Sequence, residues 1–239
     1  MGSVEKDQML ADDISITIID YRGAKCSYPV TAIKKHINGS AFVAFYDLAA
    51  VAADNEMQPL DWAVSTLLQA PIRRYSAFES LWKDNKDIWV ACNRALEQLG
   101  PDRPLEDVDS ELLRGQVQAT FRAFMAPPGI GPSIAAKTLH KKRPQLIPVI
   151  DNFVATVLSG RPGVTLDAAS MTSIIFNDFR PQLLSNLYAL RETSQQLLAD
   201  GLSLSLIRIF DIAIWMCADK KRSEYGLPQP PIAPGRTTP

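Results

Sequence analysis

Residues 127–137 read PPGIGPSIAAK and residues 148–151 read PVID, and these two stretches decide how the rest of the chain is interpreted. Gly129 and Gly131 bracket one apolar residue. A Gly-x-Gly sequence between two helices favours a tight turn that a Cβ would obstruct. The small residues that follow indicate a second helix, whose first N–H groups and positive dipole end form an anion site. We therefore expect a helical hairpin over residues 112–142.

Basic side chains follow this turn. Lys137 lies one and a half turns into the second helix, and residues 140–143 read HKKR at its end. An anion site beside such a run favours a phosphodiester backbone as the ligand. The alternative is that residues 140–143 are simply a solvated helix end. The residues expected to contact duplex DNA are Gly129, Ile130, Gly131, Ser133, Lys137, His140, Lys141, Lys142 and Arg143.

The hairpin and the PVID segment together resemble the helix-hairpin-helix base-excision DNA glycosylases. In that superfamily a Pro-Gly-x-Gly hairpin and a helix precede a Pro-apolar-apolar-Asp segment that ends in the catalytic aspartate. Asp151 follows Gly131 by 20 residues, about the family spacing. The resemblance covers residues 127–158 closely, and it implies a DNA repair enzyme with Asp151 as the catalytic residue.

The same resemblance implies the type of reaction. Lyase-type members carry a lysine two residues after the second glycine, where this chain has Ser133. The resemblance therefore implies a monofunctional enzyme that hydrolyses the N-glycosidic bond of a damaged or modified base and needs no cofactor. Residues 139–148 and 205–215 also resemble a bacterial domain family of unknown function, and that likeness implies no activity.

Asp151 has two interpretations. It precedes an apolar stretch that begins a helix, where an aspartate most often serves as an N-cap. In the functional interpretation the ionised carboxylate also stabilises positive charge at the sugar carbon of a flipped nucleotide. Two other hypotheses remain open at this point, namely a non-catalytic hairpin module that binds DNA and a helical interaction protein that binds no nucleic acid.

Composition excludes several classes of protein. The chain has 239 residues and a formal net charge of −1, so DNA binding would depend on a local basic patch. Three cysteines far apart in the sequence predict neither a disulfide framework nor a zinc knuckle, and they favour a reducing cytoplasm. Several relatives of the glycosylases carry a four-cysteine iron–sulfur cluster after the catalytic segment, where this chain has only Cys217, so the resemblance implies no cluster. Two histidines are too few for a usual metal site. No signal peptide or membrane span is visible, and the sequence leaves the oligomeric state open.

Hydrophobic periodicity predicts an all-α protein with at most a small N-terminal strand pair. Residues 1–12 are expected to be disordered, residues 13–224 to form one helical domain, and the proline-rich residues 225–239 to be a disordered tail. The alternating residues 14–18 predict a strand. Its nearest candidate partner is residues 41–46, which fit a helix equally well.

A few other side chains are candidates for binding or packing. Arg208 and Asp211 are three residues apart on an apolar helix, and we expect a partly buried ion pair there. Trp62, Tyr75, Trp82 and Trp89 are expected to lie mostly in the core, with stacking on a base as the alternative. Gln69, Arg73 and Arg74 are weaker candidates for contacts to DNA.

Overall fold

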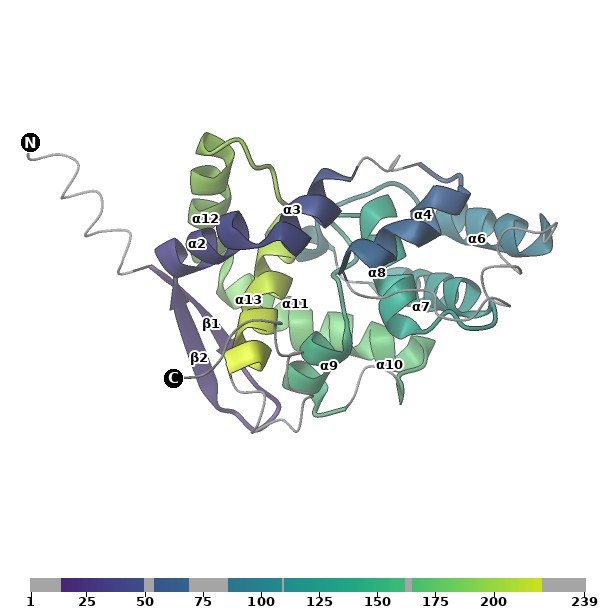
Figure 1. Ribbon diagram of the computed structural model, residues 1–239. Helices are drawn as coiled ribbons and strands as arrows, with labels where there is room; N and C mark the ends of the chain where they lie inside the picture. The colour runs from purple at the N-terminus through teal and green to yellow at the C-terminus, as the bar shows by residue number, and fades with distance from the viewer. Residues whose placement is uncertain (1–13, 50–53, 69–85, 109, 162–164, 221–239) are drawn as a thin grey trace, which may run out of the picture.

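The computed structural model describes residues 14–49, 54–68, 86–108, 110–161 and 165–220, which form a mainly α-helical fold with one small antiparallel sheet (Figure 1). The fold class predicted from the sequence is therefore confirmed. Residues 1–12 and 225–239, which were predicted to be disordered, lie outside the described residues.

The sheet consists of β1 (Ser15–Ile19) and β2 (Lys25–Pro29). In β1 the apolar side chains of Ile16 and Ile18 are buried and alternate with polar ones, as the pattern predicted. Residues 41–46, the candidate partner of this strand, are instead helical, which was the alternative that the sequence left open. A tight turn at Gly23 (φ +81°) brings β2 back beside β1, and the Asp20 carboxylate accepts two backbone N–H groups of that turn.

The helices before the hairpin begin directly after β2. They are α2 (Val30–Gly39), α3 (Ala41–Leu48), α4 (Pro59–Ala63), the 3₁₀ helix η1 (Val64–Leu68) and α6 (Lys86–Leu99). α4 begins at Pro59 with a capping box, in which the Asp61 carboxylate accepts the N–H of Gln58 at 2.7 Å. Proline at the first helical position and a carboxylate in the first turn both stabilise a helix start.

The predicted hairpin is confirmed as two helices joined by a short turn. After the 3₁₀ turn η2 (Leu105–Asp107), α7 (Glu111–Met125) begins at Ser110, whose hydroxyl accepts the N–H of Leu113. α8 (Pro132–Lys142) follows and packs on α7. Ala135 and Ala136 are fully buried in α8, and their small side chains allow the two helices to approach closely.

The chain after the hairpin forms α9 (Asn152–Ser159), α10 (Ala168–Ser173), the π-helix η4 (Ile174–Phe179), α11 (Arg180–Ser185), α12 (Leu187–Ala199) and α13 (Leu206–Lys220). Asp167 caps α10, and its carboxylate accepts the N–H of Ser170 at 2.7 Å. Pro181 lies in the first turn of α11, and the wide π turn before it, with Arg180 N–H on Ile175 C=O, accommodates the proline ring.

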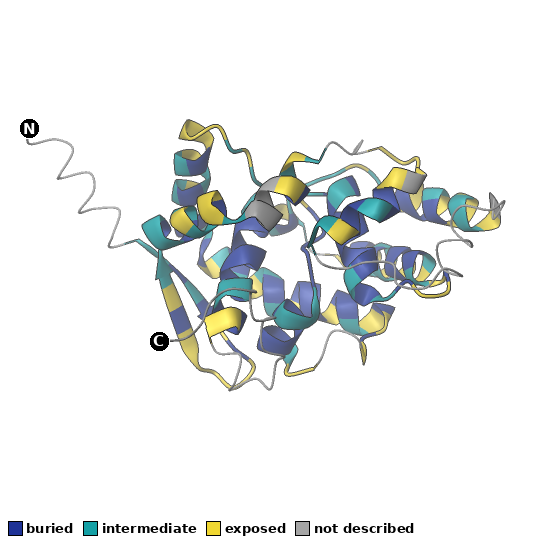
Figure 2. Cartoon of the chain, viewed as in Figure 1, coloured by how far each residue is buried: buried dark blue, intermediate teal, exposed yellow. Residues whose placement is uncertain are grey.

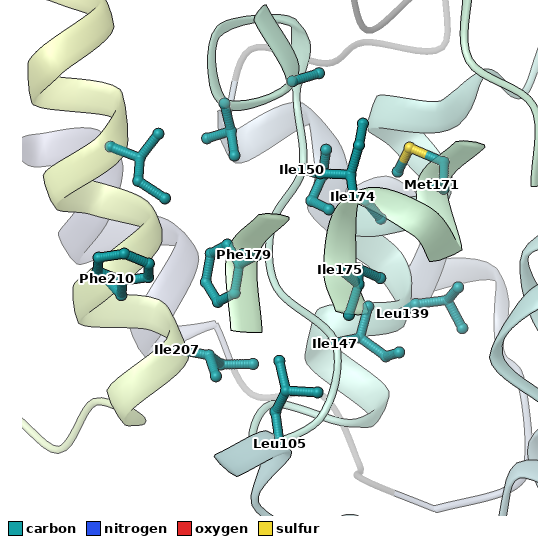
Figure 3. Close-up of a cluster of buried hydrophobic side chains, with 14 of the residues drawn as sticks. Leu105, Leu139, Ile147, Ile150, Met171, Ile174, Ile175, Phe179, Ile207 and Phe210 are labelled. Atoms are coloured by element: carbon teal, nitrogen blue, oxygen red, sulfur yellow. The ribbon is translucent and has the colours of Figure 1, made fainter. Parts of the chain in front are cut away.

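One hydrophobic core joins the hairpin to the C-terminal helices. Figure 3 shows side chains of α8, the segment after it, η4 and α13 gathered in this core. In Figure 2 the buried residues run through the centre of the molecule, and α13 packs against β1 on one side and α9 on the other. The core residues labelled in Figure 3 are Leu105, Leu139, Ile147, Ile150, Met171, Ile174, Ile175, Phe179, Ile207 and Phe210.

Candidate functional site

The hairpin turn requires glycine at position 129 but not at position 131. Gly129 has φ +86°, a left-handed conformation that favours glycine, and Ile130 N–H closes the turn on Pro127 C=O at 3.1 Å. Gly131 instead has an extended backbone (φ −94°), and a Cβ there would meet nothing within 4 Å. The expectation that both glycines avoid a Cβ clash was therefore wrong for Gly131.

The start of α8 presents backbone donors beside this turn. Gly131 occupies the N-cap position and Pro132 the first helical position, and the N–H of Ala135 bonds the carbonyl of Gly131 at 3.0 Å. Helix geometry leaves the N–H groups of Ser133 and Ile134 without an intrahelical acceptor. Ser133 is half-buried and Gly129 is exposed, so this part of the turn faces solvent.

The basic side chains of α8 lie inside the protein, which corrects the expected surface run. Lys137, His140, Lys142 and Arg143 are all buried, and Lys141 is half-buried. Both interpretations of residues 140–143, phosphate contacts and a solvated helix end, required exposed side chains. The role of these residues in DNA binding stays a prediction that this geometry does not favour.

Lys142 and Arg143 anchor the end of α8 to distant segments. The Lys142 ammonium contacts Asp61 at 2.8 Å and Asp54 at 3.0 Å, and it donates to the Glu56 carbonyl. The Arg143 guanidinium donates to the side chain of Asn55 and to main-chain carbonyls. Those carbonyl acceptors are Gly100 at 2.7 Å, Lys142 at 2.8 Å, Leu96 at 3.1 Å and Asp54 at 3.1 Å. Both cations are thus paired within the fold.

His140 and Lys141 hold α8 against its neighbours. The His140 Nδ1 lies 2.7 Å from the Ile147 carbonyl, and burial lowers the pKa of this histidine to about 3. Lys141 donates to the Tyr46 carbonyl at 2.8 Å and lies over the Tyr46 ring. The pKa of Lys141 is lowered by burial, and Asp47 nearby opposes that change.

Asp151 is the N-cap of α9. Its Oδ1 accepts the N–H groups of Phe153 at 2.9 Å and Val154 at 3.1 Å, so the structural interpretation of this residue is confirmed. Its side chain is 15% exposed, and its second oxygen makes neither cap bond. An N-cap carboxylate faces the positive end of the helix dipole.

Lys137 lies beside this carboxylate. Its ammonium is 3.9 Å from Asp151 Oδ2 and donates to the Leu68 carbonyl at 2.7 Å. Burial lowers the pKa of Lys137, while the charge of Asp151 acts in the opposite direction. The backbone of Lys137 is fixed as well, because the Tyr46 hydroxyl donates to its carbonyl at 2.6 Å. The structure thus brings together two of the predicted site residues, Lys137 and Asp151.

A buried ion cluster supports the segment that leads to Asp151. Arg208 Nη1 contacts Asp211 at 2.8 Å, so the predicted ion pair on this helix is confirmed. Sequence reasoning missed Asp47, which pairs with the Arg208 Nε at 3.0 Å; a single carboxylate in the apolar run AFVAFYDLAA was the available signal. Asp211 Oδ2 also accepts the Val149 N–H at 3.1 Å, two residues before Asp151. Burial raises the pKa of Asp211 to about 7.

The aromatic residues divide between core and surface. Trp62 is buried against Phe124 and Trp89 packs on the core, as predicted for most of the aromatic set. Sequence reasoning missed a half-buried aromatic row beside the start of α9. This row consists of the rings of Phe153, Trp215 and His36, in that order. Neighbouring ring centroids are 5.8 Å apart. Tyr75, Trp82, Gln69, Arg73 and Arg74 lie outside the described residues.

The described residues show a surface hollow away from Asp151 and no metal-binding cluster. A surface hollow of about 400 Å³ lies between Glu106, Gln145, Ser194 and the start of α13, and Asp151 does not line it. Among the described residues, no cluster of three or more His, Cys, Asp or Glu side chains is arranged to hold a metal ion. None of the described helices has the length and apolarity that crossing a membrane requires.

A family model described as "Family of unknown function (DUF6308)" matches residues 27–218. The chain belongs to this family. The DUF6308 match begins within β2 and spans the hairpin and Asp151, and it includes residues 139–148 and 205–215, which resembled a bacterial domain family of unknown function. The match does not support the resemblance to DNA glycosylases, which stays a prediction. No curated protein and no solved structure matches the chain.

Proposed function

We propose that this DUF6308 chain binds duplex DNA through the turn of the hairpin and that Asp151 promotes hydrolysis of an N-glycosidic bond. The observation that carries the proposal is that the two oxygens of the Asp151 carboxylate make different contacts. One oxygen accepts both cap bonds, and the other makes neither and lies 3.9 Å from the Lys137 ammonium. A fixed, partly exposed carboxylate of this kind suits stabilisation of developing positive charge.

The binding part of the proposal rests on the backbone of the hairpin. The exposed turn at Gly129 and the N–H groups at the start of α8 suit a phosphate group, because a helix start offers both donors and a positive dipole end. Buried Lys137, Lys142 and Arg143 do not enter this interface. With a net charge of −1 on the chain, such contacts fit sequence-independent binding that is weak at high salt.

In the proposed reaction the bond between the sugar C1′ and the base nitrogen breaks first. The electron pair leaves with the base, which takes up a proton, and water then adds hydroxyl to C1′. Asp151 stabilises the oxocarbenium-like charge and orients the water. The aromatic row of Phe153, Trp215 and His36 supplies planar surface beside the start of α9, where an extruded base can stack.

Strand cleavage tests the catalytic part. Duplexes with a panel of modified bases are incubated with the wild type or with Asp151→Asn and then treated with alkali, which breaks the strand at abasic sites. Asparagine is also a good N-cap, so this variant keeps α9 capped and removes the charge. Cleavage by the wild type alone is the expected result. Equal cleavage by both proteins would contradict a catalytic role for Asp151.

The second candidate is a non-catalytic DNA-binding module. It is favoured by the fact that the cap bonds and the neighbouring Lys137 already account for both oxygens of Asp151. A gel shift separates it from the other hypotheses. If wild type and Asp151→Asn shift DNA equally and neither cleaves it, the module is the correct function. If neither shifts DNA, the hairpin serves a helical interaction protein instead.

Ser133 is the best residue with which to test the DNA interface. Ser133→Glu places a carboxylate where the phosphate is expected, yet it leaves α8 stable because an acidic side chain in the first turn favours a helix. We expect Ser133→Glu to abolish the gel shift at low salt and Ser133→Ala to retain it. Lys137→Glu is a poor probe, since it would bury a second carboxylate beside Asp151.

A further inference from the structure

Two of the three cysteines are distant in sequence and adjacent in space. Cys26 lies in β2 and Cys217 in the last turns of α13, 191 residues further along the chain. The Sγ of Cys217 is 2.8 Å from the Sγ of Cys26, which is about 0.8 Å longer than a disulfide bond. Both side chains are buried. The sequence spacing had predicted no disulfide framework, and the fold alone brings this pair together.

The elements that carry Cys26 and Cys217 hold the two thiols next to each other. α13 packs against β1, whose Ile18 pairs with Cys26, so the two sulfurs are held by elements that are already in contact. The half-buried Tyr28 lies close to both thiols. Its pKa is raised first by burial and then by Cys217 and Cys26. Cys92 differs, since its Sγ points at the Ala123 carbonyl at 3.8 Å and burial raises its pKa to about 12.

We propose that Cys26 and Cys217 form a redox-active pair that a peroxide converts into a disulfide between β2 and α13. One thiolate attacks hydrogen peroxide, gives a sulfenic acid and releases hydroxide. The second thiol then displaces the hydroxyl group, so that an S–S bond forms and water leaves. In sum, two thiols and one hydrogen peroxide give one disulfide and two waters. The proposal is independent of any activity at Asp151.

The oxidised bond would close a loop that contains most of the domain. Because a cross-link that closes a long loop removes entropy from the unfolded chain, it stabilises the folded state. It would also fix α13, which carries Arg208, Asp211 and Trp215, to the N-terminal sheet. We therefore expect the midpoint of thermal unfolding to rise by roughly 5–15 °C on oxidation.

Thiol counting on the full-length protein tests the proposal without any mutation. The protein is treated with dithiothreitol or with one equivalent of hydrogen peroxide, denatured, alkylated and weighed by mass spectrometry. The reduced protein should take up three alkyl groups and the oxidised monomer one, on Cys92. Proteolysis should then release a linked peptide with Cys26 and Cys217.

Variants and unfolding temperatures complete the test. Cys92→Ser should still lose two alkylation sites on oxidation, whereas Cys26→Ser and Cys217→Ser should form no disulfide within the monomer. The rise in unfolding temperature should appear in the wild type and in Cys92→Ser only. Three alkylated cysteines in peroxide-treated wild type, sulfinic acid without a cross-link, or disulfides only between molecules would each overturn the proposal.

Discussion

At the scale of single residues, Asp151 performs a structural task that can be separated from the proposed chemical one. Its Oδ1 caps α9, and its charge lies beside the buried Lys137. Asp151→Ala removes both contributions and leaves a buried ammonium with one partner fewer, so we expect a loss of about 2–4 kcal/mol in the free energy of unfolding. Asp151→Asn keeps the cap and should lose less. Urea unfolding of both variants measures the difference, and equal losses would contradict this account.

The pH dependence of stability follows from His140. Burial lowers its pKa in the folded state to about 3, whereas an unfolded histidine titrates near 6.5. Between these values the unfolded chain binds a proton that the folded chain does not, so stability present above the unfolded pKa is lost as the pH falls. We expect a loss of about 2–3 kcal/mol between pH 7 and pH 4.5.

Two histidine variants check this expectation by urea unfolding across that range. His140→Gln should flatten the dependence on pH, even if it lowers stability at pH 7. His36→Gln is the matched control. The pKa of His36 is also lowered by burial, but this side chain is only half-buried, so its variant should keep most of the slope. A slope unchanged in His140→Gln would show that other groups cause the acid loss.

At the scale of elements, the two glycines of the hairpin turn make different demands. Gly129 has φ +86°, where a side chain is strained, whereas Gly131 is an extended N-cap with open space around it. Gly129→Ser should therefore cost about 1 kcal/mol or more. Gly131→Ser introduces a preferred cap and should gain a few tenths of a kcal/mol. Thermal unfolding of the pair measures both, and a larger loss at Gly131 would refute this assignment.

The sequence predicted elements well where local signals agree. The apolar periodic run after residue 110 predicts a helix capped by Asp109 or Ser110, and Ser110 is the cap of α7. Asp151 before another apolar run located the start of α9. β2 was missed because its five residues, KCSYP, include a lysine and end in proline. Residues 41–48 were ambiguous, because a continuous apolar run fits a strand or a buried helix.

The candidate site was predictable only in part. The spacing from the hairpin identified Asp151, but the burial of the basic residues depends on remote segments. Arg143 is satisfied by carbonyls near residues 54, 96 and 100, and Lys142 by carboxylates of residues 54 and 61. The sequence of a basic run does not show which hydrogen-bond acceptors or carboxylates the fold will place next to it. The same is true of Asp47 with Arg208.

At the scale of the whole molecule, side-chain amides join the N-terminal sheet to the C-terminal helices. The Asn186 amide accepts the N–H of Thr17 at 2.7 Å and donates to its carbonyl at 2.9 Å. Gln182, one helical turn earlier, forms the same pair of bonds with Ile19. These amides cover the edge of β1 as a third strand would, and an exposed edge favours association with other chains.

Removal of one amide tests this junction. Asn186→Ala leaves the backbone groups of Thr17 without their partner in a part-buried site, so we expect a loss of about 1–3 kcal/mol and faster hydrogen exchange at the Thr17 amide. Gln182→Ala is the control, because its bonds are exposed and should contribute less. Unchanged exchange at Thr17 in Asn186→Ala would contradict the proposed role of the amide.

The hydrogen bonds between the sheet and the C-terminal helices affect how this protein can fold during its synthesis on the ribosome. Thr17 and its partner Asn186 are 169 residues apart, so β1 is made long before the group that completes its edge exists. At about 5–20 residues per second, synthesis of the intervening chain takes on the order of ten to thirty seconds. Throughout that interval the edge of β1 lacks the Asn186 and Gln182 amides that cover it in the folded protein, and an open strand edge can pair with other chains.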